Sequence, residues 1–463
     1  MSTHHTTTTG HVPPTATLTR GPDAPGRALS PALLPATVLA PTVPLLDGRL
    51  VDYAQLDHAA STPALASVAR AVASVTATYS SVHRGTGWLS RVTSAHYEAA
   101  REEVARFVGA RPEDLVVFTR TTTDATNLLA GALPDATPVV VFDSEHHASL
   151  LPWDAERTHR LPVPHSPAQA VAALGDTLAG LADGPQPLVV VTGASNVTGE
   201  LWPLEEIVGL ARRHGARVLL DAAQLLAHRP VDLAGLGADW LVLSGHKLHA
   251  PFGAGALVGR ADWLDAAPPY LAGGGASLAV TADEVTWATG AARHEGGSPN
   301  VVGAVALAAA CAALREHRGA VEAHEAALTQ RLLRGLRAVP GVRTLSLFGE
   351  DHERVPVVAF TVDGLDSHLV AAALSAEDGI GVRAGKFCAH RLVDTLLSRA
   401  GAGGDTAVRA SAGLATTAEH VERLLTAVAR LAAAGPAGEY RLREGAGWEP
   451  SVDPRTLEAA LPW

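Results

Sequence analysis

The sequence predicts an α/β protein whose large domain has a mainly parallel sheet, followed by a smaller α+β domain. Short apolar runs rich in Val and Leu, without polar alternation, indicate strands that are buried on both faces. Helical patterns separate these runs, and repeated β-α-β units imply a mainly parallel sheet with helices on its faces. From about Gly319 the pattern changes to helices that flank short strands.

The first part of the chain alternates between predicted helices and strands. We expect helices over 94–108, 123–133 and 203–213, and strands over 115–118, 139–142, 188–191, 218–220 and 240–243. The helix over 203–213 starts with Pro203 and stops at Gly215, which are the residues preferred at these two ends. Because ligands of parallel sheets bind at the carboxyl ends of strands, polar residues just past these runs are the candidates for a site.

The chain is long enough for two domains, since 463 residues exceed the size of one hydrophobic core. We expect helices over 321–339 and 420–434 in the second domain, with strands around 357–362 and 380–383. Residues 1–45, rich in Thr, Pro, Ala and His, predict a disordered or loosely packed arm. The predicted division is a large domain over 46–318, whose first residues join the small domain, a small domain over 319–437, and an extension over 438–463 that docks on the body.

The composition excludes several classes of protein. With 36 basic and 47 acidic residues the net charge is -11, which argues against nucleic acid or an anionic membrane as the main partner. Two cysteines, Cys311 and Cys388, are too few for a disulfide framework and fit a reducing compartment. We find neither a signal-peptide pattern nor an uninterrupted apolar stretch of membrane-spanning length, and expect a cytoplasmic protein.

Two of the predicted strands end in complementary polar clusters. Ser244-Gly245-His246-Lys247 follows the strand over 240–243, and Asp221-Ala222-Ala223-Gln224 follows the strand over 218–220. An amine that forms a Schiff base and an acid that pairs with a pyridinium nitrogen are what a pyridoxal phosphate (PLP) site needs. Alone, Lys247 would more often be a surface lysine, and Asp221 with Gln224 a loop acid and a helix cap.

The segment Thr119-Arg120-Thr121-Thr122-Thr123-Asp124 lies between a predicted strand and a predicted helix. Hydroxyls and free N–H groups at a helix N-terminus suit a phosphate. The alternative is an ordinary N-cap, with Thr121 as the cap and Asp124 three residues on, as in a capping box. The two interpretations are compatible.

Histidines supply another candidate contact. In Glu145-His146-His147, just past a strand, one ring is placed to stack on an aromatic cofactor. The alternatives are a solvated loop or a metal pair, but adjacent histidines make a poor chelate. His246 and His249 have a zinc-like spacing, yet no suitably spaced cysteine or carboxylate accompanies them, so we predict no metal site.

Three further polar residues have both a functional and a plain interpretation. Asn196 is a turn residue or a polar contact to a cofactor ring. Arg409 is a surface ion pair or a fork for a substrate carboxylate. Cys388 has basic neighbours at Lys386, His390 and Arg391 that favour a thiolate, whereas a free cysteine is more commonly a buried small hydrophobe. Cys311, inside an apolar helix, fits the second description.

Taken together, these residues resemble the class V aminotransferase family of fold-type I PLP enzymes, and within it the second type of the cysteine desulfurase/selenocysteine lyase group. The resemblance covers roughly residues 50 to 435. It is carried by ordered matches at 56–61, 82–85, 145–148, 195–199, 221–224, 244–248, 295–300, 382–385 with 388–389, and 409–411. It implies the PLP-transferase fold, in which a large domain has a seven-stranded-type, mainly parallel sheet flanked by helices and is followed by a smaller α+β domain.

The resemblance also implies roles for individual residues. Lys247 would carry the cofactor covalently, Asp221 would pair with the pyridine nitrogen, and His146 would stack on the ring. The remaining cofactor contacts would come from Thr122, Thr123, Asn196, Gln224, Ser244 and His246, with Ser298 supplied by the partner subunit of a homodimer. The substrate would meet Arg409 and His83, and Cys388 would be the nucleophile that takes sulfur from it.

The implied function is that of a PLP-dependent cysteine desulfurase-like enzyme. It would remove sulfur or selenium from L-cysteine or selenocysteine, giving alanine and a persulfide on Cys388 for a sulfur-acceptor protein. The chain departs from the desulfurase pattern in several places. Lys386-Phe387 stands where desulfurases usually have a histidine pair, His249-Ala250 replaces Tyr-Gly, and Thr121 and Ala125 replace glycines.

Two alternatives therefore stay open. One is another class V enzyme, a carbon–sulfur lyase, epimerase or aminotransferase, in which Cys388 is not the nucleophile. The other is a non-catalytic binding protein on the same fold, against which the presence of Lys247, Asp221 and His146 argues.

Overall fold

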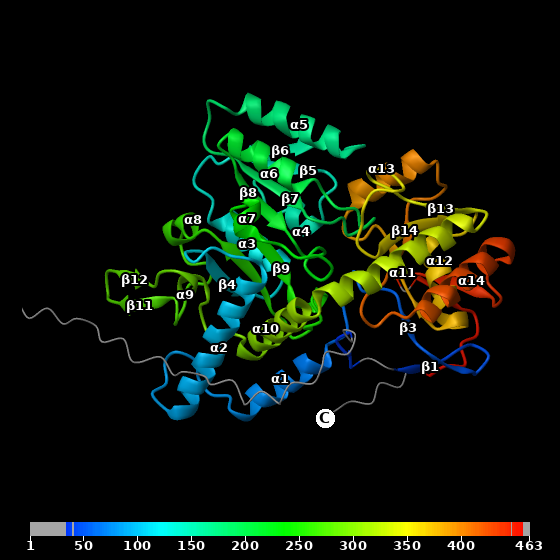
Figure 1. Ribbon diagram of the computed structural model, residues 1–463, viewed down its shortest axis with the longest axis horizontal. Coiled ribbons are helices and arrows are strands. Elements are labelled where there is room, and N and C mark those ends of the chain that lie inside the picture. Colours follow the sequence, from blue (N-terminus) through cyan, green and yellow to red (C-terminus); the bar gives the residue numbers. More distant parts are fainter. Residues whose placement is uncertain (1–33, 39–40, 446, 457–463) are drawn as a thin grey trace, which may run out of the picture.

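The computed structural model describes residues 34–38, 41–445 and 447–456, and these fold around two sheets (Figure 1). Most of the predicted N-terminal arm and the last residues of the predicted extension lie outside the described residues. The predicted boundaries at residues 45, 318 and 437 stay predictions. The two sheets come from segments on either side of residue 318.

The larger sheet has seven strands in the order β4-β10-β9-β8-β7-β5-β6. Only β10 runs antiparallel to its neighbours β4 and β9, so the predicted mainly parallel sheet is confirmed. The bounds are β4 Leu115–Thr119, β5 Val139–Phe142, β6 Thr158–Leu161, β7 Leu188–Thr192, β8 Arg217–Asp221, β9 Trp240–Ser244 and β10 Gly255–Gly259.

Helices cover both faces of this sheet. Alternate strand residues such as Val140 and Leu220 pack in one core with α2, α5, α6 and α10, whereas Val141 and Leu219 pack in another with α3 and α8. Two-sided burial explains why the strands are apolar without alternation. The helices are α1 Ala66–Ala77, α2 Trp88–Phe107, α3 Thr122–Gly131, α4 His147–Leu150, α5 Pro167–Gly180, α6 Leu204–Arg213, α7 Leu233–Leu236, α8 Asp262–Ala266, α9 Ala291–His294 and α10 Val301–Glu316.

The second sheet is antiparallel, in the order β13-β14-β17-β16, and packs against α11, α12 and α14. The long helix α11 leads from the large sheet to this second unit (Figure 1). Its elements are α11 Arg318–Ala338, β13 Val342–Thr344, β14 Val357–Val362, α12 Ser367–Asp378, β15 Ile380–Gly381, β16 Arg383–Gly385, α13 His390–Ala400, β17 Ala407–Ser411 and α14 Ala418–Ala434.

The one strand predicted over 380–383 is two strands with different partners. β15 pairs in parallel with β3 (Ala54–Gln55), and β16 pairs with β17 in the second sheet. A short chain segment that changes partner within four residues leaves no periodic signal, so the sequence pattern could not separate them. β1 Thr42–Pro44 pairs with β2 Leu50–Asp52, next to this region.

The predicted docking of the C-terminal extension is confirmed for its described residues. Glu377 of α12 accepts hydrogen bonds from the Ala437 N–H (3.1 Å), the Gly438 N–H (3.0 Å) and the Tyr440 hydroxyl (3.0 Å). The hairpin β18 Tyr440–Arg443 and β19 Gly447–Pro450 follows and contacts α12. The extension is thus held on the second unit, away from the carboxyl edge of the large sheet.

A buried carboxylate ties the two units together beside that edge. Glu200 follows β7 and is fully buried, and it accepts hydrogen bonds from the N–H groups of Phe348 (2.9 Å) and Gly349 (3.2 Å). The preceding Gly199 has φ +74°, and a Cβ there would lie 2.5 Å from the Val355 carbonyl oxygen. This close crossing fixes the loop that carries Asn196.

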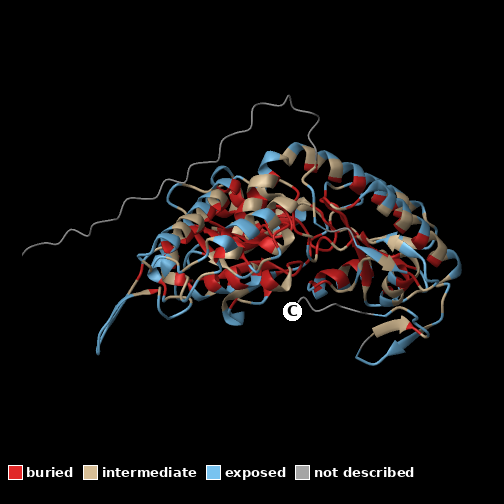
Figure 2. Cartoon of the chain, turned by 90° about the horizontal axis from the view of Figure 1, so that it is seen from below, coloured by how far each residue is buried: buried red, intermediate tan, exposed pale blue. Residues whose placement is uncertain are grey.

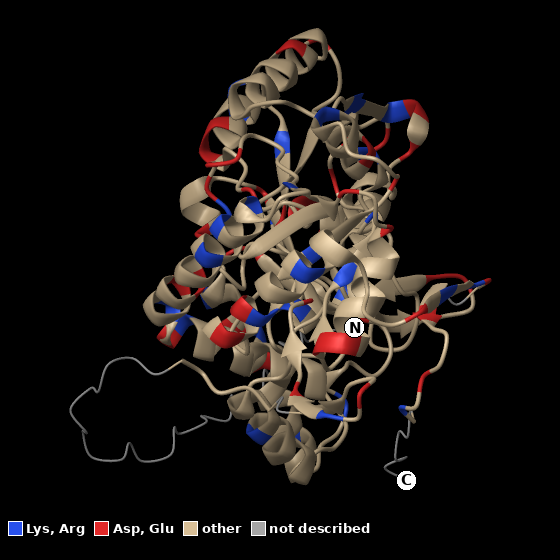
Figure 3. Ribbon diagram, turned by 90° about the vertical axis from the view of Figure 1, so that its right-hand side faces the viewer, with Lys and Arg blue, Asp and Glu red and all other residues tan. Residues whose placement is uncertain are grey.

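The surface of the described residues carries charge of both signs. Basic and acidic residues are interspersed along the elements in Figure 3, and several form local pairs such as Arg343 with Asp363 at 2.8 Å. In the described part of the chain, no helix combines the length and the apolar character needed to cross a membrane.

Candidate active site

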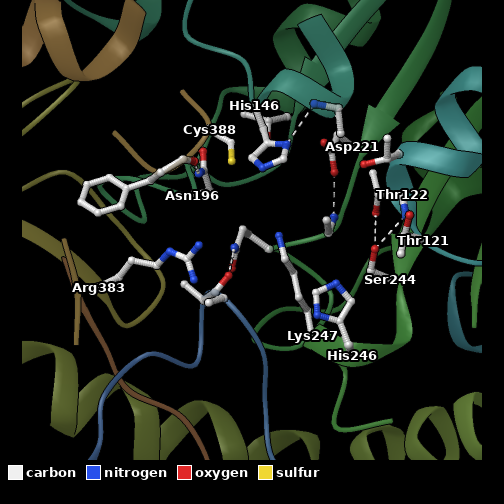
Figure 4. Close-up of a pocket in the computed structure, with 18 of the residues that line it drawn as sticks. Thr121, Thr122, His146, Asn196, Asp221, Ser244, His246, Lys247, Arg383 and Cys388 are labelled. Atoms are coloured by element: carbon white, nitrogen blue, oxygen red, sulfur yellow. Dashed lines mark hydrogen bonds between the residues drawn. The ribbon is translucent and has the colours of Figure 1, made fainter. Parts of the chain in front are cut away.

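A cavity opens at the carboxyl edge of the large sheet, where residues from the second unit cover it (Figure 4). The ends of β5, β7, β8 and β9 bring together polar residues that are far apart in sequence. The cavity is lined by Ala59, Ala60, Thr121, Thr122, Thr123, His146, Ala148, Thr192, Asn196, Asp221, Ala223, Gln224, Ser244, His246 and Lys247, with Arg383, Phe387, Cys388 and Arg409 from the second unit.

Lys247 extends into this cavity from a turn that follows β9 (Figure 4). Gly245 permits the turn, because a Cβ there would lie 2.6 Å from the Ala254 carbonyl oxygen of the loop before β10. Burial lowers the pKa of Lys247 to about 8, and Arg409 acts in the same direction while Asp221 opposes it. Lys247 therefore exchanges a proton close to neutral pH.

Asp221 ends β8 and is held rigidly. Its Oδ2 accepts a hydrogen bond from the Ser149 hydroxyl (2.6 Å), and its Oδ1 accepts one from the Ala223 N–H (3.0 Å). The side chain is buried, and each of its two oxygens has a hydrogen-bond donor. The two donors leave Asp221 oriented toward the cavity that it lines.

A second buried carboxyl lies beside Asp221. Glu145 accepts a hydrogen bond from the N–H of Thr192 (3.1 Å), and Thr192 is the β7 residue paired with Asp221 in the sheet. Complete burial and the charge of Asp221 raise the pKa of Glu145 well above its usual value. Burial therefore disfavours the charged form of Glu145, the carboxyl group that lies beside Asp221.

The N-terminus of α3 forms a donor-rich cradle at the other side of the cavity. Thr121 is the N-cap and accepts a hydrogen bond from the Asp124 N–H (3.4 Å), so the predicted cap is confirmed. The Ser244 hydroxyl accepts a hydrogen bond from the Thr122 N–H (2.7 Å) and shares another with the Thr122 hydroxyl (2.8 Å). Together with Thr123 and His246, this cradle offers hydroxyl and N–H groups to an anion.

His146 presents a flat, uncharged ring to the cavity (Figure 4). It is the N-cap of α4, and its Nδ1 accepts a hydrogen bond from the Ala148 N–H (3.0 Å), which places the ring proton on Nε2. Burial lowers its pKa to about 3, with the charge of Lys247 adding to the effect. A neutral ring next to Lys247 and Asp221 is suited to stacking.

Two amide side chains link the cavity wall to other segments. Gln224 donates from Nε2 to the Ala59 carbonyl (2.7 Å), which fixes the segment after β3 against the large sheet. Asn196 donates from Nδ2 to the Phe387 carbonyl (2.8 Å), which belongs to the second unit. Both residues line the cavity, as do all predicted cofactor contacts except Ser298.

Arg409 lies deep in the wall and has two fixed hydrogen bonds. Its Nη1 donates to the Asn196 carbonyl (2.9 Å) and its Nη2 to Asp57 (2.9 Å), so the interpretation of Arg409 as a surface ion pair is wrong. The buried Nε has no partner among the described residues, and Arg409 lines the cavity. A guanidinium at the cavity wall suits a carboxylate ligand.

Asp57 and Arg383 were missed as site residues in the sequence. Arg383 lines the cavity and is half-exposed, with its Nη1 3.8 Å from Asp57. Both belong to stretches that match the family pattern, 56–61 and 382–385. Their position within these motifs is the sequence feature that could have identified them as site residues.

Cys388 is exposed at the cavity, in contrast to the fully buried Cys311, so its interpretation as a buried hydrophobe is wrong. Its carbonyl accepts a hydrogen bond from the His147 N–H (2.8 Å). Two basic neighbours of Cys388 form ion pairs with carboxylates. Lys386 pairs with Asp394 and Arg391 with Asp143, both at 2.8 Å.

His83 and Ser298 do not line the cavity of their own chain. His83 lies near the start of α2, where its Nε2 is 2.9 Å from Glu98, and Ser298 is exposed before α10. Their predicted roles stay predictions. Among the described residues, no group of three or more His, Cys, Asp or Glu side chains is arranged to hold a metal ion.

Known proteins resemble this chain over most of its length. The "Probable cysteine desulfurase" of Vibrio cholerae is 35% identical over 359 residues, which cover 75% of this chain and 85% of the relative. The "Cysteine desulfurase" of Synechococcus elongatus is 36% identical over 361 residues, which cover 76% of this chain and 56% of that relative.

Solved structures extend the comparison to the fold. An apo cysteine desulfurase from Thermococcus onnurineus superposes with a TM-score of 0.73 at 30% identity, covering 82% of this chain and 95% of its own. A cysteine desulfurase from Escherichia coli gives a TM-score of 0.70 at 31% identity, covering 82% and 94%. These neighbours confirm the predicted fold class. Since the family model for class V aminotransferases matches residues 54–424, the segment that builds both sheets and the cavity, the chain belongs to the class V aminotransferase family.

Proposed function

We propose that this protein is a PLP-dependent cysteine desulfurase, which removes sulfur from L-cysteine or selenium from selenocysteine and leaves alanine. The observation that carries the proposal is that Lys247, Asp221 and Cys388 face one cavity, although they come from three separate segments. The relatives and solved structures named cysteine desulfurase support it.

The residues of the cavity fit PLP. The cradle of Thr122, Thr123, Ser244 and His246 offers donors to a phosphate, and Ser244 is fixed there by its two hydrogen bonds to Thr122. Asp221 would hold the pyridine nitrogen, His146 would stack, and Asn196 and Gln224 would lie beside the ring. When bound to Lys247, PLP supplies an electron sink for the Cα of an amino acid.

The chain's own groups would then carry out the acid–base and sulfur steps. Lys247, with a pKa of about 8, is able to move a proton at neutral pH. Arg409, which lines the cavity, would hold the substrate carboxylate. The Cys388 thiolate would attack the substrate sulfur, so that a sulfur–sulfur bond forms as the carbon–sulfur bond breaks and the persulfide stays on Cys388.

A second candidate function rests on one specific departure. Phe387 replaces the histidine that usually precedes the desulfurase nucleophile, and its buried ring lies against Arg409. This difference in the substrate half of the cavity favours, as the alternative, a carbon–sulfur lyase, epimerase or aminotransferase in which Cys388 is not the nucleophile.

We also propose a homodimer with Ser298 contributed across its interface. Apolar side chains exposed near Ser298 support an interface there, namely Leu271, Leu278 and Val280, the last two on the hairpin of β11 (Ser277–Val280) and β12 (Val285–Trp287). This hairpin projects from the body as an exposed ribbon (Figure 2). A cytoplasmic location agrees with two free cysteines, and the exposed Cys388 would be accessible to a sulfur-acceptor protein.

The covalent role of Lys247 is tested with the second lysine as control, because the sequence contains only Lys247 and Lys386. Lys247→Ala should abolish the visible absorbance of the purified protein loaded with PLP, and Lys386→Ala should retain it. Borohydride reduction and peptide mass spectrometry should find the pyridoxyl group on Lys247. A wild-type protein that takes up no PLP would contradict both the desulfurase hypothesis and the alternative of another class V enzyme.

The role of Cys388 is tested by assaying sulfide and alanine from L-cysteine. Cys388→Ser should lower the rate by about a hundredfold or more, because the sulfur loses its acceptor. Cys311→Ala, which alters the other, buried cysteine, is the matched control. Full desulfuration by Cys388→Ser would exclude Cys388 as the nucleophile and leave the alternative function standing.

The lowered pKa of Lys247 predicts its reactivity in the apoprotein. A group whose pKa is lowered to about 8 becomes a free amine as the pH rises through 8. Acetylation of Lys247 should therefore rise with a midpoint near pH 8, as measured by peptide mass spectrometry. Lys386, whose hydrogen bond to Asp394 raises its pKa, should react only at higher pH. Equal pH profiles for the two lysines would refute the lowered pKa.

The shared site is tested by mixing Lys247→Ala with Ser298→Glu subunits after dissociation. Each variant alone should bind little PLP. In an equal mixture about a quarter of the sites should regain absorbance, because each mixed dimer has one intact site. If Ser298 served its own chain, no mixed site would be intact and none would recover. Sedimentation velocity of the wild type should give a dimer.

A further inference from the structure

The segment that carries Cys388 has an unfavourable backbone conformation. It connects β16 to α13, and the consecutive residues Phe387 and Cys388 have φ of 52° and 53°. Non-glycine residues rarely adopt this left-handed region, because the Cβ then approaches the following carbonyl oxygen. Two such residues in succession persist only where surrounding contacts fix them.

The fixing contacts come from the large sheet. Asn196, after β7, donates from Nδ2 to the Phe387 carbonyl (2.8 Å), and the His147 N–H at the start of α4 donates to the Cys388 carbonyl (2.8 Å). Two consecutive peptide groups of the second unit are thus anchored to two loops at the carboxyl edge. The position of the thiol depends on these loops as well as on its own segment.

The ring of Phe387 connects this segment to the arginine of the cavity. The ring is buried, and the guanidinium carbon of Arg409 lies 5.1 Å from its centroid. Arg409 also donates from Nη1 to the carbonyl of Asn196 (2.9 Å). Asn196, Phe387 and Arg409 therefore form a closed triangle in which each residue contacts the other two.

We infer that Asn196 and Phe387 are positioning residues that couple Arg409 to the Cys388 thiol. This inference rests on the proposed function, in which Arg409 receives the substrate carboxylate and Cys388 the substrate sulfur. A carboxylate that binds Arg409 acts on a guanidinium stacked on Phe387 and bonded to Asn196. Both contacts lead to the peptide groups that orient Cys388, so carboxylate binding and thiol placement are linked.

In this triangle, Phe387 packs its ring on Arg409, a contact that differs from the one that a histidine at the same position would make. A phenyl ring offers the guanidinium an apolar, electron-rich face and has no hydrogen-bonding group of its own. The left-handed Phe387 turns its carbonyl to Asn196 while its ring covers Arg409. The departure from the desulfurase pattern at 386–387 thus serves placement of the nucleophile in this chain.

The first test measures the segment itself in the apoprotein, without catalysis. Hydrogen exchange of a peptide covering 383–397 should become about tenfold faster in Asn196→Ala and in Phe387→Leu, because anchoring contacts are lost. Phe107→Leu, which changes a phenylalanine of α2 that is as buried as Phe387 and lies outside the cavity, should leave this peptide unchanged. Unchanged exchange in Asn196→Ala and Phe387→Leu would overturn the inference.

The second test separates carboxylate binding from sulfur transfer in the PLP-loaded protein. L-alanine carries the carboxylate without sulfur, and its binding is followed by the change in visible absorbance. Phe387→Leu should raise the half-saturating concentration of L-alanine about fivefold, because Arg409 loses its stacked face. Asn196→Ala should lower the rate of desulfuration about tenfold at saturating L-cysteine and PLP, because the Phe387 carbonyl loses its donor.

The double variant Asn196→Ala/Phe387→Leu decides whether the two residues act as one unit. Its rate of desulfuration should be no lower than that of the slower of the two single variants, because the effects of coupled residues do not add. Losses that multiply would show two independent residues and overturn the coupling. If the protein fails to desulfurate L-cysteine at all, the proposed function fails. The exchange and L-alanine experiments would still decide the coupling.

Discussion

The site depends on the register of the parallel strands β7, β8 and β9. Their faces are covered by helices, so polar side chains are accommodated only past their ends, and the register brings those ends to one edge. Thr192 lies beside Asp221, Ser244 ends the next strand, and Lys247 follows it. A shift of this register would separate the amine from the carboxylate while leaving each strand apolar. The register of the sheet therefore places the amine and the carboxylate at the same edge.

Burial at this edge determines which groups carry charge. It suppresses ionisation of Glu145, keeps His146 neutral and lowers the pKa of Lys247 to about 8. Asp221 is fixed in place by two donors, the Ser149 hydroxyl and the Ala223 N–H, which satisfy its oxygens. Because burial keeps Glu145 from ionising, the Asp221 carboxylate of the proposed PLP site would meet the pyridinium nitrogen without a second carboxylate charge competing for the same position.

The sequence predicts this half of the site well, because Lys247, Asp221 and His146 each lie directly past a strand whose end is readable. It predicts the other half poorly. In the contact of Phe387 with Arg409, a guanidinium packs on a ring from a different segment. The two residues with left-handed backbone are Phe387 and Cys388, and neither is a glycine that would signal this conformation in the sequence. Asp57 reaches Arg409 from the N-terminal segment that pairs with β15. Such contacts arise from tertiary packing, which leaves no periodicity in the sequence.

This division follows the architecture. The proposed cofactor contacts other than Ser298 lie on the large sheet unit, whereas Arg383, Phe387, Cys388 and Arg409 lie on the second unit. The departures from the desulfurase pattern nearest the sulfur chemistry, Lys386 and Phe387, fall on the second unit, so they alter the substrate half while the amine and the carboxylate stay in place. Because Asn196 contacts both halves, it is the residue through which a change at Phe387 reaches the cofactor side. The placement of the proposed substrate residues thus depends on the contacts of Asn196 that join the second unit to the sheet.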